Sequence, residues 1–113
     1  MRCLILFLLA LTVIVAQVEV TQLDITQGPE NGGTIISVTG SGFVSSGLLQ
    51  CRFDDVEVTA IFNSNTVIVC QTPLHAIGVV TVSASNDGTT FSTSTVSFTY
   101  NGMRYTLVSD LLL

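Results

Sequence analysis

The segments QCRF (residues 50–53) and VIVCQTP (residues 67–73) each carry one cysteine within a short apolar run. Both runs are rich in aromatic or β-branched residues, and turn-forming residues flank them, which is typical of β-strands. With side chains alternating between two faces, Cys51 and Cys70 each fall on the same side as a large apolar neighbour. The two segments therefore predict two core strands, each with a cysteine on its buried face.

The first 16 residues have the pattern of a secretory leader. Arg2 precedes an apolar run from Cys3 to Val15, and the small residue Ala16 follows. The run of about 13 residues matches the apolar part of a signal peptide and is shorter than the roughly 20 residues of a spanning helix. We therefore expect residues 1–16 to be removed on secretion. A cleavage site usually has a small residue two positions before the last leader residue, but Ile14 occupies that position here. Cleavage one or two positions away, or retention of the leader as an anchor, is therefore the alternative.

The cysteine count fits an oxidising compartment. Of three cysteines, Cys3 leaves with the leader, so Cys51 and Cys70 remain as an even pair, 19 positions apart. A disulfide is the simplest interpretation, and a closed loop of this size would stabilise the fold by roughly 3 kcal/mol. Two free core thiols or two metal ligands are the alternatives. Metal binding is disfavoured because this pair and the lone His75 fall short of a four-ligand zinc set; we expect no metal and no cofactor.

The rest of the chain predicts an all-β fold. Apolar residues alternate with polar ones, glycine, asparagine, aspartate and serine interrupt the runs, and no helical period is sustained. The last two strands should form a long hairpin with its turn at Asn86-Asp87-Gly88 and with Ser83 facing outward. About seven short strands at this spacing favour a β-sandwich. We expect them near residues 20–26, 34–40, 48–53, 56–62, 67–72, 80–84 and 96–100.

Five short motifs resemble those of one known family in their order and spacing: Gly28-Pro29 with Gly32-Gly33-Thr34, Ile36 to Gly40 with Phe43, Cys51 to Phe53, Val69 to Pro73, and Val96 to Tyr100. Together they are similar to the IPT/TIG domain, an immunoglobulin-like module shared by plexins and transcription factors. The resemblance implies an early-set immunoglobulin-like β-sandwich, with Cys51 and Cys70 disulfide-bonded as in its extracellular branch. It implies a domain at residues 20–101, between the leader and a short tail at 102–113.

The charge balance excludes nucleic acid as a ligand. The chain has a formal net charge of -5, and only two basic residues remain once Arg2 leaves. Binding to nucleic acid usually needs several phosphate contacts from Lys or Arg. The tail at 102–113 is too short and too interrupted to span a membrane. We therefore expect no nucleic-acid partner and no membrane span after leader cleavage.

Residues that could perform catalysis are scarce. His75 is the single histidine, and a triad with Asp54 or Asp55 and one of many serines has no nucleophile elbow to fix it. The chain has no lysine for Schiff-base chemistry. The acidic group Asp54, Asp55 and Glu57 could meet a calcium ion, but a solvated hairpin turn is the favoured interpretation. We expect that this chain is not an enzyme and that it has no catalytic residue.

Two functions follow from these expectations. The first is a secreted or cell-surface binding and adhesion module that recognises another extracellular protein, with a glycan as the less favoured ligand. The alternative is a structural spacer, one unit of a larger plexin-like or multi-IPT surface protein. We expect an extracellular location, or tethering to the membrane where the leader is retained. The ligand-binding residues and the oligomeric state are not predicted by the sequence.

Overall fold

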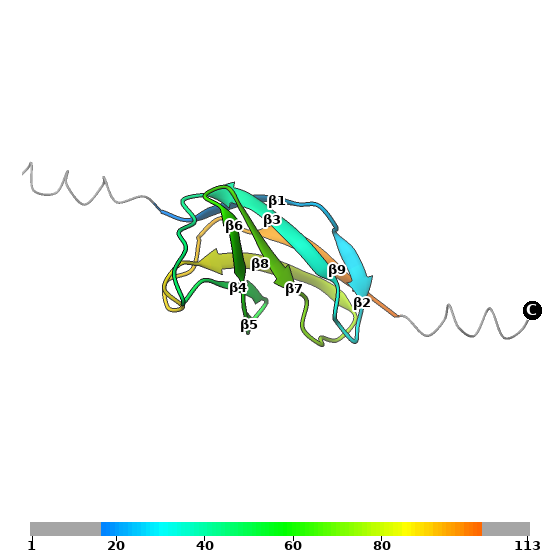
Figure 1. The fold of residues 1–113 in the computed structure, drawn as a ribbon. Coiled ribbons are helices and arrows are strands. Elements are labelled where there is room, and N and C mark those ends of the chain that lie inside the picture. The colour runs from blue at the N-terminus through cyan, green and yellow to red at the C-terminus, as the bar shows by residue number, and fades with distance from the viewer. Residues whose placement is uncertain (1–16, 103–113) are drawn as a thin grey trace, which may run out of the picture.

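Two β-sheets packed face to face make up residues 17–102, the part of the chain that the computed structural model describes (Figure 1). The predicted all-β sandwich is confirmed. The expected leader at 1–16 and nearly all of the expected tail lie outside the described residues. Within the described range, no helix is long and apolar enough to cross a membrane.

Nine strands form the two sheets. The four-stranded sheet has the order β1-β3-β7-β6, and the five-stranded sheet has the order β2-β9-β8-β4-β5. Neighbours are antiparallel except β2 and β9, which run parallel. The strands are β1 (Glu19–Leu23), β2 (Gln27–Pro29), β3 (Ile35–Ser41), β4 (Gln50–Phe53), β5 (Val56–Thr59), β6 (Ile61–Ser64), β7 (Val67–Gln71), β8 (Gly78–Ser85) and β9 (Val96–Asn101).

The strand count exceeds the expected seven because one predicted strand is divided between the sheets and one short strand forms where none was expected. The segment expected at 20–26 contains β1 only, and the additional strand β2 follows it and joins the other sheet. The segment expected at 56–62 is divided at Ala60, between β5 and β6. Ala60 is buried, and its amide donates to the Leu49 carbonyl oxygen at 3.0 Å. A small inward side chain at this corner lets the chain bend from one sheet to the other.

The core lies between the sheets, and the alternation seen in the sequence builds it. Ile36 and Val38 of β3 face Cys51 and Phe53 of β4 across the sandwich interior, and all four are fully buried. Aromatic rings fill the five-stranded side, where Phe98 makes edge contacts with Phe53 and Tyr100. The other buried hydrophobic residues are Val20, Leu23, Phe43, Leu49, Ala60, Ile68, Cys70, Val80, Val82 and Ala84.

The hairpin of the last two strands is present, but its expected turn is wrong. Pairing of β8 with β9 ends at Val82 and Val96, and the loop 86–95 joins the two strands. Asn86-Asp87-Gly88 forms only the first part of this longer connection. The reason is tertiary: the Asn86 amide group is hydrogen-bonded to the backbone of the loop that follows β3.

The loop 86–95 also changes the environment of the outer face of β8. Ser83 lies opposite Arg52 in the β4–β8 pairing, and it is buried, as is Ser85, so its expected exposure is wrong. The Arg52 guanidinium lies over the ring of Phe91, 4.0 Å from the ring centroid. The loop 86–95 therefore covers this end of the sheet, and small serine side chains fit beneath it.

Candidate functional site

The disulfide between Cys51 and Cys70 joins the two sheets. Cys51 lies on β4 of the five-stranded sheet, and Cys70 lies on β7 of the four-stranded sheet. Both side chains are buried. The bond therefore crosses the core and ties the layers together, and neither sulfur is available as a thiol nucleophile or a metal ligand.

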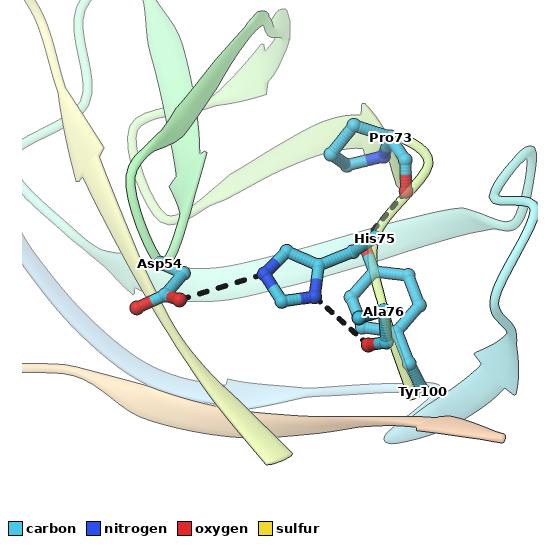
Figure 2. A network of polar contacts seen from close by, with 5 residues as sticks. All are labelled: Asp54, Pro73, His75, Ala76 and Tyr100. Atoms are coloured by element: carbon cyan, nitrogen blue, oxygen red, sulfur yellow. Dashed lines mark hydrogen bonds and ion pairs between the residues drawn. The ribbon is translucent and has the colours of Figure 1, made fainter. Parts of the chain in front are cut away.

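A polar cluster lies just beyond the disulfide, where the chain leaves β4 and β7 (Figure 2). Asp54 begins the turn after β4, and His75 follows β7. The His75 Nε2 atom lies 3.4 Å from an Asp54 carboxylate oxygen, and its Nδ1 atom lies 2.9 Å from the Ala76 carbonyl oxygen. Since both oxygens are acceptors, the ring donates to both only when each nitrogen carries a proton.

Tyr100 supports this cluster from the core. The His75 ring stacks on the Tyr100 ring with centroids 5.0 Å apart. The buried Tyr100 hydroxyl donates to the Pro73 carbonyl oxygen at 2.8 Å. Burial raises the pKa of Tyr100 to about 12, with a smaller opposing effect from the Thr72 hydroxyl. The tyrosine therefore fixes the segment after β7, which in turn positions His75.

The cluster has no hydrolytic triad in its geometry. The polar partners of the His75 ring within residues 17–102 are Asp54 and Ala76, and neither offers the hydroxyl or thiol nucleophile of a triad. The structure brings together Asp54 and His75, which sequence reasoning considered only as a triad without fixed geometry. Their proximity could have been inferred from the cysteine pair, because Asp54 and His75 each follow a bridged cysteine by a few residues. The arrangement holds two loops together at this end of the sandwich.

Asp54 and Asp55 form the hairpin turn that the sequence favoured. Asp54 and Asp55 connect β4 to β5, and Asp54 has a positive φ of 63°, which Asp tolerates better than most residues. Glu57 is exposed and lies opposite Arg52 in the β4–β5 pairing. In the described part of the chain, no group of three or more His, Cys, Asp or Glu side chains could hold a metal ion.

An open groove of about 330 Å³ lies at the opposite end, between residues 17–18 and the loop 86–95. Phe91, Thr90 and Asp87 are among the residues that line it. One Asp87 carboxylate oxygen accepts hydrogen bonds from the Thr90 and Thr89 amides, at 2.8 and 2.9 Å, and from the Ser85 hydroxyl at 2.9 Å. These bonds hold the pKa of Asp87 well below its usual range. The groove thus offers a carboxylate, hydroxyl groups and an aromatic ring.

Two solved structures with a similar fold come from plexin A4. The chain is similar to a structure of the plexin A4 full extracellular region, domains 1 to 10, with a TM-score of 0.65 and 19% identity, covering 78% of this chain and 8% of that chain. A second plexin A4 structure, domains 1 to 8, gives a TM-score of 0.63 and 19% identity, over 76% of this chain and 9% of that chain. The chain thus spans less than a tenth of either plexin A4 chain, and the likeness is one of fold.

A comparison with curated proteins found no match. The family model of the IPT/TIG domain matches residues 19–100, which include every strand of the sandwich except the last residue of β9. The predicted resemblance is therefore confirmed, and this chain belongs to the IPT/TIG domain family.

Proposed function

We propose that this chain is a secreted or cell-surface binding module without enzymatic activity, and that it recognises another extracellular protein. The observation that carries the proposal is the Cys51–Cys70 disulfide within an IPT/TIG domain, because structural disulfides persist in oxidising compartments. Its similarity to domains of the plexin A4 extracellular region supports the same compartment. In this proposal, residues 1–16 are a cleaved leader, 20–101 the binding domain and 102–113 a short tail.

Intact mass spectrometry tests the compartment. The full sequence is expressed in a secreting cell, and the mass of the protein in the medium is measured with and without reduction. A mass that lacks residues 1–16 and rises by about two hydrogens on reduction supports secretion with an oxidised Cys51–Cys70 pair. A full-length product with free thiols that stays in the cell contradicts the proposal.

Binding to intact cells tests recognition. The purified, labelled protein is applied to cells before and after their surface is treated with a protease or with glycosidases. Saturable binding that the protease abolishes and the glycosidases leave intact supports a protein partner. A lack of binding to any cell type, under conditions where a plexin IPT domain binds, counts against the proposed binding function.

A glycan is the second candidate ligand, and the groove beside the loop 86–95 favours it. Sugar hydroxyls pair with carboxylate and hydroxyl groups, and sugar rings pack on aromatic side chains, all of which this groove contains. Phe91→Ala removes the aromatic ring and leaves the carboxylate of Asp87 in place. Cell binding that glycosidases abolish and that Phe91→Ala weakens would assign the ligand to this groove.

The structural spacer is the alternative function, and the positions of the chain ends favour it. The start of β1 and the end of β9 lie at opposite ends of the sandwich (Figure 1). The plexin A4 chains with the same fold contain many domains in one chain. Sequencing of the full transcript separates the two functions, since an in-frame continuation into further domains supports the spacer, and a stop codon after Leu113 without a spliced continuation contradicts it.

A further inference from the structure

The free edges of the two sheets differ in their protection against pairing with another chain. An edge strand presents unpaired N–H and C=O groups, and proteins block such edges with charged side chains, proline, bulges or covering segments. In the described part of the chain, the edges are β1 and β6 of the four-stranded sheet and β2 and β5 of the five-stranded sheet. Each can be compared for these blocking features.

Three of the edges are blocked. β1 contains Glu19, and its Val20 amide donates to the Ser94 hydroxyl at 2.9 Å, so a neighbouring loop occupies part of this edge. β2 has three residues and ends in Pro29, which has no N–H to donate. β5 contains Glu57 and directly follows an acidic turn. An added strand would therefore meet a charge, a proline or a covering segment at each of them.

β6 has neither a charge nor a proline nor a cover. Within the described residues, the backbone of Ile61–Ser64 makes no hydrogen bond outside its pairing with β7. Of the blocking features it has only a register shift between Phe62 and Ser64, and the edge β1 has a shift of the same kind. Ile61 is 67% exposed and Phe62 is 37% exposed. Such an apolar, uncharged edge is a template for a further strand.

The surroundings of β6 indicate which strand would be added. From Val58 to Leu74, the sequence contains no Asp, Glu, Lys, Arg or His, although the whole chain has a net charge of -5. Two copies of this protein therefore meet no like charges across β6, whereas the edges β1 and β5 each carry a glutamate. An antiparallel pair of identical strands is also self-complementary about a two-fold axis. Charge and symmetry together favour a second copy of the same chain.

We propose that β6 is a self-association edge, at which the β6 strands of two copies pair antiparallel. The pairing joins two four-stranded sheets into one continuous sheet and removes Ile61 and Phe62 of both copies from water. Because the strand is short, the interface belongs to the small, transient class, and we expect a dissociation constant of about 0.01 to 1 mM. This interface goes beyond the proposed recognition of another protein and does not depend on it.

Sedimentation equilibrium tests the proposal with protein purified from a secreting host that expresses the full sequence. The wild type is expected to change from monomer to dimer between about 1 µM and 2 mM. Ile61→Lys places like charges across the edge and should raise the dissociation constant at least about tenfold. Asn63→Lys, at a second exposed position of β6, should do the same. Val79→Lys is the matched control, since Val79 is an apolar residue of β8 with 69% exposure, and it should dimerise as the wild type does.

Three results would overturn the proposal. The first is a wild type that stays monomeric at about 2 mM, since most chains would be dimeric there even at the upper end of the expected range. The second is a dimer that persists unchanged in both Ile61→Lys and Asn63→Lys. The third is a dimer that Val79→Lys weakens as much as Ile61→Lys does. All three positions are exposed, and the circular dichroism spectrum of each variant verifies that the sandwich is intact.

Discussion

The hydroxyl group of Tyr100 is buried and has the Pro73 carbonyl oxygen as its hydrogen-bond partner. Tyr100→Phe keeps the ring and removes this bond, so we expect the free energy of unfolding to fall by about 1 kcal/mol. Urea denaturation measures the change. Thr21→Val is the control, because it removes an exposed side-chain bond to the Thr39 carbonyl oxygen and should change stability by much less.

The same hydroxyl group makes stability depend on alkaline pH. Burial raises the pKa of Tyr100 from 10.0 to about 12, so the unfolded chain loses the phenol proton at a lower pH than the folded chain. The stabilisation is complete below about pH 10 and is lost as the pH rises towards about 12. Urea denaturation over this range should show a decline in the wild type that is smaller in Tyr100→Phe. Identical pH dependence in the two proteins would show that another group is responsible.

At the scale of elements, the contact between β1 and β3 depends on a residue without a side chain. A methyl group on Gly40 of β3 would collide with the Glu19 carbonyl oxygen of β1. Gly40→Ala should therefore push β1 away from β3 and lower the free energy of unfolding by roughly 2 kcal/mol or more. Thermal or urea unfolding measures this loss. Gly47→Ala is the matched control, since a methyl group there has no neighbour within 4 Å, and equal losses in both variants would contradict the explanation.

The loop 86–95 depends on the Asp87 carboxylate. Asp87→Ala removes its bonds to the Thr89 and Thr90 amides, so both amides should exchange hydrogen faster, as NMR can measure. Because these bonds lower the pKa of Asp87, their stabilisation is present at neutral pH and is lost as the pH falls below about 4. Asp55→Ala is the control, and slow exchange that persists in Asp87→Ala at neutral pH would show that the carboxylate does not hold the loop.

Single elements show what the sequence could predict and where it was wrong. The burial of Ile36 and Val38 follows from period-two alternation, which is a local property. The change of sheet at Ala60 depends on a bond to the distant Leu49 carbonyl group, and the loop 86–95 depends on contacts to the loop after β3. These features arise from tertiary contacts that strand propensity does not encode.

In the candidate site, too, some features were expected from the sequence and others depend on tertiary contacts. The pairing of Cys51 with Cys70 was expected from the count of cysteines and from the family resemblance. The approach of His75 to Asp54 was not predicted, although both residues closely follow the paired cysteines and the pairing brings their two loops together. The groove beside Asp87 was also missed, since it exists only once the N-terminal residues lie against the loop 86–95.

At the scale of the whole molecule, the disulfide connects the two layers and restricts the unfolded chain. Replacing both cysteines, as Cys51→Ala with Cys70→Ala, should lower the free energy of unfolding by roughly 2–5 kcal/mol. Urea denaturation with and without a reducing agent measures the effect. The wild type should lose stability on reduction, whereas the double variant should not respond. A wild type whose unfolding is unchanged by reduction would contradict a stabilising bond.

The positions of the chain ends, together with the disulfide, also determine how this protein responds to tension. The described chain begins near β1 at one end of the sandwich and finishes after β9 at the other, so a pulling force runs along its length (Figure 1). Even after complete unfolding, the covalent ring closed by Cys51 and Cys70 cannot open. The stretched chain is therefore shorter by roughly 60 Å than a reduced chain. A change in redox conditions would release this hidden length, which makes the oxidised domain a link of limited extensibility.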